Sequence, residues 1–152
     1  MAAPSADQQE AWRALVMASH VLAEALDRQS RRDGGLPHTY YTLLVTLFES
    51  GEHRLRMSQL AAELRCSTSR LTHAVSSLER SGLVERVRST EDRRVQHLVL
   101  THAGEDMVRR VTPGQVREVR LPVLAALDPA DTADLLRLSR LVTAALEPDD
   151  TE

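Results

Sequence analysis

Apolar residues near the start of the chain recur with the spacing of one helical face. Between residues 11 and 26 this stripe contains Trp12, Leu15, Val16, Ser19, Leu22, Ala23 and Leu26. The i, i+3, i+4, i+7 pattern predicts a long amphipathic helix. We expect it to end at Gly34-Gly35, because paired glycines do not sustain a helix and Pro37 cannot continue one. A second helix is predicted over residues 39–50, before Gly51, and its expected buried residues are Tyr40, Leu43, Leu44, Leu47 and Phe48.

Two shorter helical patterns follow, separated by a tight connection at Arg65-Cys66. Ser58 is the expected N-cap of the first, which places Leu60, Ala61 and Leu64 inward, with Met57 positioned to pack against it. Ser67 is the expected N-cap of the second, and Gly82 ends it. The inward residues of that second helix are Leu71, Ala74, Val75 and Leu78.

The period then changes from helical to alternating. Residues 83–88 and 95–100 alternate apolar and polar positions around a polar turn at residues 89–94, which predicts a two-stranded hairpin. Thr101 is the expected cap of a fifth helix, disturbed at Pro113-Gly114 and near Pro122. Asp128-Pro129 begins a last helix, whose apolar stripe contains Leu135, Leu138, Val142 and Leu146.

This order of elements predicts a mainly α fold with a small β-hairpin, of the winged helix-turn-helix type. The 152 residues suffice for a single domain, 1–152. Within it we expect a winged lobe at residues 37–101, with a recognition helix at 67–81 and a wing at 83–100. Residues 8–32 and 102–147 are expected to form a helical dimerisation lobe, because their apolar stripes leave surface that a two-fold partner would cover.

Composition places the protein among ordinary soluble domains, with 42% hydrophobic and 27% charged residues. A single cysteine, no apolar run long enough to span a bilayer and no signal-peptide pattern at the start lead us to expect a cytoplasmic protein without membrane contact. The net charge is −3, yet residues 53–94 contain nine arginines against five acidic residues. A locally basic segment in an acidic chain is the expected footprint of a polyanion site.

The outward face of the helix at residues 67–81 is short, polar and nearly free of acids. Hydroxyls at a helix N-terminus bind phosphates together with the free backbone N–H groups, while Arg70 is placed to reach a guanine edge and Arg80 a phosphate. The candidate DNA-binding residues of this helix are Ser67, Thr68, Ser69, Arg70, Thr72, His73, Ser76, Ser77 and Arg80. Taken alone, the outward face of this helix is equally compatible with an ordinary solvent-exposed surface that binds nothing.

The following hairpin decides between these interpretations. Leu83-Val84-Glu85-Arg86, Asp92-Arg93-Arg94 and Leu98-x-Leu100-Thr101-x-x-Gly104 resemble the MarR family of regulators, as do Met57-Ser58-x-Leu60-Ala61 and Leu78-Glu79-x-x-Gly82-Leu83-Val84. The resemblance extends over about residues 12–142. It implies an obligate homodimer, a recognition helix in the major groove and a wing-tip arginine in the minor groove, here Arg94 steadied by Asp92. Arg93 and Arg88 complete the candidate wing contacts. Arg65 and His73 depart from the family pattern, in which glycine and arginine are frequent at these positions.

The sequence therefore predicts a sequence-specific DNA-binding transcription regulator, a ligand-responsive repressor acting as a homodimer on a pseudo-palindromic duplex. Two alternatives stay open: a winged protein-interaction module that does not bind DNA, and a thiol-based redox sensor acting through Cys66. We expect Cys66 to pack as a small hydrophobe.

The resemblance also implies a small aromatic effector near the junction of the lobes. The candidate lining residues, with His20 as polar anchor and a plain core role as the alternative, are Trp12, Val16, His20, Tyr40 and Leu44. No metal, cofactor or enzymatic activity is expected. The sequence contains no histidine pair at i, i+4, no Cys-x-x-Cys, no glycine-rich phosphate loop and no Gly-x-Ser-x-Gly.

Overall fold

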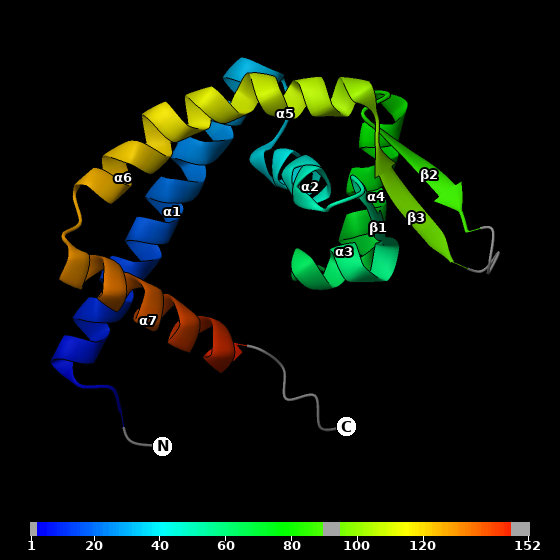
Figure 1. The fold of residues 1–152 in the computed structure, drawn as a ribbon. Helices are drawn as coiled ribbons and strands as arrows, with labels where there is room; N and C mark the ends of the chain where they lie inside the picture. The colour runs from blue at the N-terminus through cyan, green and yellow to red at the C-terminus, as the bar shows by residue number, and fades with distance from the viewer. Residues whose placement is uncertain (1–2, 90–94, 147–152) are drawn as a thin grey trace.

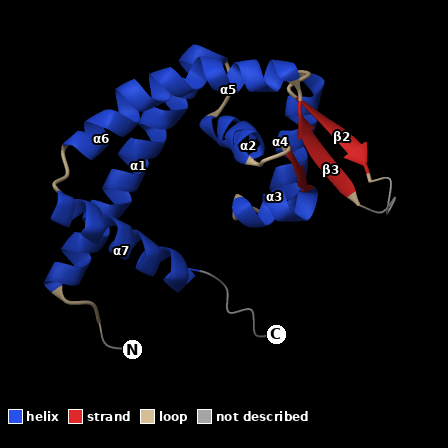
Figure 2. Cartoon of the chain, in the orientation of Figure 1, coloured by secondary structure: helices blue, strands red, loops and turns tan. Residues whose placement is uncertain are grey.

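The computed structural model describes residues 3–89 and 95–146 and has the predicted fold class, mainly helical with one small antiparallel sheet (Figures 1 and 2). In chain order the elements are α1 (Ala6–Gly34), α2 (His38–Glu49), β1 (Arg54–Arg56), α3 (Met57–Glu63), α4 (Thr68–Arg80), β2 (Val84–Arg88), β3 (Gln96–Leu100), α5 (His102–Gln115), the π-helical η1 (Val116–Arg120), α6 (Leu121–Ala125) and α7 (Pro129–Leu146). Figure 1 shows α2, α3, α4 and the sheet gathered at one end, with α1, α6 and α7 extending away from them.

The first helix begins earlier than its apolar stripe indicates. Ser5 Oγ accepts a hydrogen bond from the backbone N–H of Gln8 at 3.2 Å, and the Gln8 side chain accepts one from the Ser5 N–H at 2.8 Å. This reciprocal capping box fixes the start of α1. At the other end Gly35 has φ 70°, and its N–H donates to the Arg31 carbonyl at 2.9 Å. The predicted glycine stop is confirmed.

The hydrophobic core lies between α2, α5 and the elements of the winged lobe, which are α3, α4 and the sheet. Leu43, Leu44 and Leu47 are buried as predicted, whereas Tyr40 and Phe48 are only half-buried. Tyr41 takes the interior position instead, since it is 2% exposed and its hydroxyl lies 2.8 Å from Thr112 Oγ1 on α5. Tyr41 is three residues before Leu44, so it shares the buried stripe, while a partner for the phenol oxygen makes the burial favourable.

The sheet has three strands in the order β1-β3-β2, one more than the predicted hairpin. Strand β1 pairs antiparallel with β3 through Arg54↔Val99, Leu55↔Leu98 and Arg56↔His97. The sequence analysis did not predict β1, because a strand of three residues is too short to show an alternating pattern and its partner β3 lies far away along the chain.

Helix α3 begins at Met57, so the prediction that Ser58 is the N-cap is wrong. The Gln59 side-chain oxygen accepts a hydrogen bond from the Arg56 N–H at 3.1 Å, which satisfies a backbone donor at the start of the helix. Arg56 is therefore the N-cap, and Ser58 lies inside the helix.

The disturbance of the fifth helix predicted at Pro113-Gly114 is wrong, whereas the one predicted near Pro122 is confirmed. Helix α5 continues through Pro113 to Gln115, and the irregular stretch is η1, where the Leu121 N–H donates to the Val116 carbonyl. Pro122 lies in the first turn of α6 and has no N–H, so it cannot donate the backbone hydrogen bond that a regular α-helix needs at this position. The residues before it form a π-helical turn instead.

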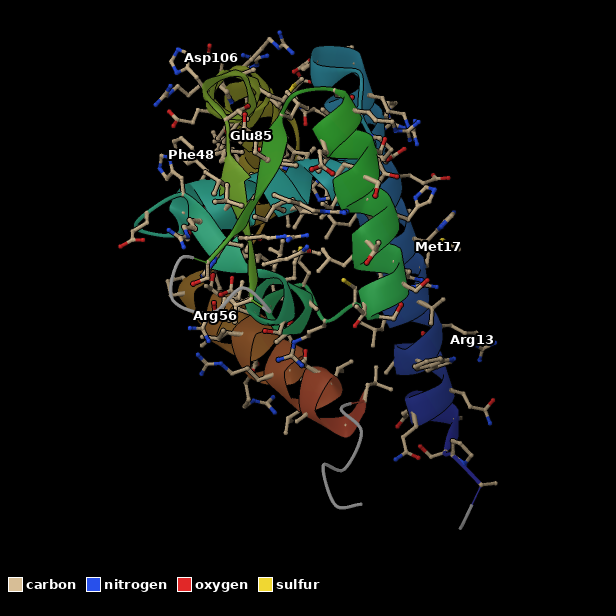
Figure 3. The ribbon with its side chains drawn as sticks, turned by 90° about the vertical axis from the view of Figure 1, so that its right-hand side faces the viewer. Arg13, Met17, Phe48, Arg56, Glu85 and Asp106 are labelled. Carbon is tan, nitrogen blue, oxygen red and sulfur yellow. The ribbon has the colours of Figure 1, made fainter. Side chains whose placement is uncertain are left out.

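Large apolar side chains remain exposed on α1, α6 and α7. The most exposed on α1 is Trp12 at 63%, and Figure 3 shows the neighbouring Met17 pointing away from the body of the molecule. The others on these helices are Leu15, Val16, Val21, Leu22, Leu121, Val123, Leu124, Leu135, Leu136, Leu138, Leu141 and Leu146. Among the described residues no helix is long and apolar enough to cross a membrane.

Candidate nucleic-acid interface

The turn into α4 is made by a residue in the left-handed region. Arg65 has φ 47°, a conformation that favours glycine, and it lies where the sequence departs from the family pattern. The Cys66 N–H donates to the Ala61 carbonyl at 3.1 Å, which closes the turn. Ser67 then caps α4 as predicted, its Oγ accepting from the Arg70 N–H at 3.4 Å. The arginine therefore adopts the backbone that the turn requires.

Helix α4 buries one stripe and exposes the other. Leu71, Val75 and Leu78 are fully buried, and they fix the rotation of the helix. Of the candidate DNA-binding residues, those exposed to solvent are Ser67, Thr68, Ser69, Arg70, Thr72, His73 and Arg80. Ser76 and Ser77 are half-buried. The first three turns therefore carry an open polar surface without an acidic side chain.

An arginine of the sheet ties the wing to this helix. Arg86 on β2 donates from Nη2 to Ser76 Oγ at 3.1 Å, and its Nε lies 3.6 Å from Glu79 Oε2. Ser76 is thus engaged by the hairpin as well as being a candidate DNA contact. The sequence analysis identified the motif that contains Arg86 but not the role of this arginine, because its partners Ser76 and Glu79 lie ten and seven positions away on another element.

The wing is the β2–β3 hairpin, and its described part ends near Arg88. Arg88 pairs in register with Gln96 and is exposed. Figure 3 shows α4 and the hairpin on the same side of the molecule. The candidate tip residues Asp92, Arg93 and Arg94 lie outside the described residues. Their minor-groove role stays a prediction.

The five candidate effector residues are distributed over different environments. Trp12, Val16 and His20 are exposed on α1, where His20 Nε2 lies 3.4 Å from Glu24 Oε1. Leu44 is completely buried in the core. Tyr40 is half-buried on α2, and its hydroxyl lies 3.3 Å from His73 Nδ1 on α4.

A cavity of about 370 Å³ lies between α1, α2 and the α5–α6 segment. None of the five candidate residues lines it; among those that do are Leu26, His38, Tyr41, Gln115, Val119 and Arg120.

His38 is the polar centre of that cavity wall. Its Nδ1 lies 3.2 Å from Ser30 Oγ and 3.4 Å from Gln115 Nε2, and its backbone N–H donates to Asp27 Oδ1 at 2.9 Å. Burial lowers the pKa of the His38 imidazole below its usual 6.5, with the carboxylate of Asp27 opposing the shift. The ring therefore favours its neutral form, in which one nitrogen donates and the other accepts.

The remaining candidate chemistry is limited. Cys66 is a free, half-buried thiol. Among the described residues no three or more His, Cys, Asp or Glu side chains come together as a group that would hold a metal ion.

Comparison with known proteins places this geometry among transcription regulators. Residues 36–95 match the model of the MarR family. The chain is similar to a MarR family transcriptional regulator from Streptomyces coelicolor solved in complex with DNA, with 40% identity and a TM-score of 0.93 over 99% of this chain and 95% of that one. It is also similar to AbsC, another MarR family regulator from that organism, with 32% identity and a TM-score of 0.90 over 96% of this chain and 98% of AbsC.

A curated relative is the transcriptional repressor MprA of Escherichia coli, 32% identical over 98 residues, which are 63% of this chain and 56% of MprA. The chain spans about half the length of the curated relatives that it matches.

Proposed function

The chain belongs to the MarR family, and from this we propose that it is a sequence-specific DNA-binding transcription regulator, a repressor that acts as a homodimer in the cytoplasm. The observation that carries the proposal is that the polar, acid-free face of α4 is joined to the wing, since Arg86 on β2 donates to Ser76 on this helix, which a buried leucine–valine stripe holds in place. The similar regulator crystallised with DNA supports the same assignment.

Three parts of the winged lobe would contact the duplex. The hydroxyls of Ser67, Thr68 and Ser69 stand at the N-terminus of α4, where the helix dipole and free N–H groups attract phosphate. Arg70 follows in the first turn and would pair with a guanine edge in the major groove. The basic wing tip with Arg93 and Arg94 would enter the minor groove, whose narrow A·T segments attract guanidinium groups.

The apolar side chains left exposed on α1, α6 and α7 support the proposed dimer. A two-fold partner would cover these side chains with an identical surface and so remove them from water. Two recognition helices about 34–36 Å apart would then read two half-sites of a palindrome.

We place the effector in the cavity between α1, α2 and the α5–α6 segment. Its apolar walls with His38, Tyr41 and Gln115 as polar groups suit a small aromatic molecule that forms one or two hydrogen bonds. Trp12, Val16 and His20 lie on a helix face that we assign to dimer contact, so we propose that they shape the interface beside this cavity.

The test is selection of duplexes from a random pool, followed by titration of the recovered duplex at several salt concentrations. With about 6–10 phosphate contacts, affinity should fall about 10³- to 10⁵-fold between 50 and 200 mM salt. Arg70→Ala should change preference at one or two base pairs by about 1–3 kcal/mol, and Arg94→Ala should weaken binding to all duplexes. Arg109→Ala on α5 is the matched control, since that exposed arginine pairs with Glu105 and lies outside the winged lobe and outside the apolar faces of α1, α6 and α7.

Binding that is absent or insensitive to salt would favour a winged interaction module instead. Binding that is lost on oxidation of wild-type protein, but retained by Cys66→Ser under the same oxidant, would favour the thiol sensor.

A further inference from the structure

The face of the sheet that points away from the core carries three basic side chains. Arg54 and Arg56 alternate along β1, and the register places Arg56 directly opposite His97 on β3. Residues directly opposite in an antiparallel pair project from the same face. The pair between them brings Leu98, which is completely buried, to the other face. Arg54, Arg56 and His97 therefore share the outer face, and we call them the basic sheet cluster.

A hydrogen bond within the cluster fixes the protonation state of the imidazole. Arg54 Nη2 lies 3.1 Å from His97 Nδ1. A guanidinium has only donors, so Nδ1 accepts, the ring is neutral and its proton is on Nε2. Partial burial lowers the pKa of His97 below its usual 6.5, the charges of Arg54 and Arg56 lower it further, and the carboxylate of Glu52 opposes the shift. The ring therefore leaves the charges of both arginines in place.

Acidic side chains do not neutralise the basic sheet cluster. Among the described residues, neither Arg54 nor Arg56 belongs to an ion pair. On β2 the residue opposite His97 is Val87, and the acid Glu85 lies diagonally across from it. Glu85 is two strand spacings, about 10 Å, from Arg54. Figure 3 shows Arg56 and Glu85 toward opposite ends of the sheet. The cluster is thus a site of uncompensated positive charge that suits an anion.

The place of the cluster in the sheet indicates which anion it would meet. The Arg56–His97 pair is one step along β3 from Gln96, which forms the last described pair before the turn of the wing. The minor groove is about 6 Å wide, so a hairpin whose tip enters it has a phosphate backbone along each of its two faces. The face toward α4 would meet one backbone, and the outer face would meet the other.

We propose that the basic sheet cluster binds a phosphate of the duplex, on the backbone that borders the minor groove on the side away from α4. The proposal rests on the function proposed above and adds a contact that neither the recognition helix nor the wing tip supplies. The solvent-exposed Arg56 would pair with the phosphate directly, and His97 would donate to it from Nε2.

Binding of the phosphate is coupled to uptake of a proton. A negative charge beside His97 favours the imidazolium, so the ring takes a proton from solvent onto Nδ1. Nδ1 then no longer accepts a hydrogen bond, and Arg54 Nη2 is released to donate to the phosphate. The bound state holds more protons than the free state, so the affinity for the duplex rises as the pH falls.

The salt dependence of duplex binding counts the phosphate contacts. Each contact contributes about 0.9 to the slope of log K against log salt concentration, so Arg56→Gln should reduce the slope by about 0.9 for each protomer bound. Arg56→Lys keeps the charge and should keep the wild-type slope. Arg109→Gln is the matched control, because that arginine is exposed on α5 and pairs with Glu105. Thermal unfolding of each variant verifies the fold.

The pH dependence of the same binding separates His97 from the other histidines. Between about pH 7.5 and 5.5 the wild-type affinity should rise, by up to about tenfold per pH unit for each proton taken up. Calorimetric titration in buffers of different ionisation enthalpy counts these protons. His97→Gln should lower the count by up to about one per protomer, whereas His102→Gln, which changes an exposed histidine at the start of α5, should leave it unchanged.

Three results would overturn the proposed phosphate site. A wild-type slope in Arg56→Gln would show that no phosphate meets the outer face. A slope that falls equally in Arg56→Lys and Arg56→Gln would show that charge is not what matters there. Equal proton uptake by His97→Gln and wild type would remove the role of the imidazole. Each of these leaves the proposed function intact, whereas a chain that binds no duplex at any salt concentration would overturn that function and this site with it.

Discussion

Replacing Leu138 by alanine is expected to weaken the proposed homodimer without disturbing the fold of the single chain. Leu138 belongs to the apolar stripe predicted for the last helix, and it is 50% exposed on α7. Alanine has a higher helix propensity than leucine, so α7 itself should persist. The change therefore isolates what the exposed leucine contributes to a partner.

The magnitude follows from the exposed half of the side chain. Full burial of a leucine stabilises by about 1.5–3 kcal/mol, so covering the exposed half of Leu138 is worth about 0.8–1.5 kcal/mol. A two-fold interface contains the residue twice, which raises the loss to about 1.5–3 kcal/mol per dimer. The dissociation constant should then rise about 10- to 150-fold.

Sedimentation velocity over a dilution series measures this constant. The emission of Trp12, the sole tryptophan, gives a second readout, because a residue 63% exposed in one chain should shift its emission to the red on dissociation. Val87→Ala on β2 is the control, since Val87 is also an exposed apolar residue but lies on the wing. A wild-type monomer at tens of micromolar, or equal shifts in the two variants, would refute the assignment of α7 to the interface.

Three further predictions concern stability and the wing. Gly104→Ala should lower the free energy of unfolding by about 1–3 kcal/mol, because a Cβ there would overlap a backbone carbonyl oxygen of the hairpin; Gly51→Ala, with open space around it, should change it by less than about 0.5 kcal/mol in the same urea titration. Arg86→Gln should cost about 1 kcal/mol of stability and reduce DNA affinity, by separating the wing from α4; an affinity equal to that of the wild type would contradict the positioning role. Burial lowers the pKa of His38, so the unfolded chain binds more protons and stability should fall as the pH drops below 6.5; His38→Gln should flatten the pH dependence of thermal unfolding below that pH.

Features with a local cause were predictable from the sequence. Ser67 and Thr101 cap their helices as expected, and the two aspartates at the start of α7 bond each other's backbone N–H groups. Gly35 and Gly82 adopt positive φ at the predicted helix ends. In each case the cap and the group that it satisfies lie within four residues, so the sequence contains both partners.

Features that depend on distant partners were not predictable. Strand β1 exists because β3 offers a free edge more than forty positions away. The interior position of Tyr41 depends on Thr112, which a periodic pattern does not reveal. The same limit applies to the site: periodicity identified the outward face of α4, but not that Arg86 would reach Ser76 from the wing.

One such contact, between His73 and Tyr40, bears on what the proposed interface would read. Where the family frequently has arginine, His73 places Nδ1 3.3 Å from the Tyr40 hydroxyl, so only Nε2 remains for a base or phosphate. Arginine would offer two parallel donors to a guanine, whereas this imidazole offers a single hydrogen bond, and a single bond discriminates less between bases. We therefore expect the base pair opposite His73 to vary among selected duplexes, and the pair opposite Arg70 to be strongly preferred. In Tyr40→Phe the second ring nitrogen is released, and the preference near His73 should change while that near Arg70 stays. A duplex pool that is equally strict at both positions, or unaltered by Tyr40→Phe, would show that His73 does not face the bases.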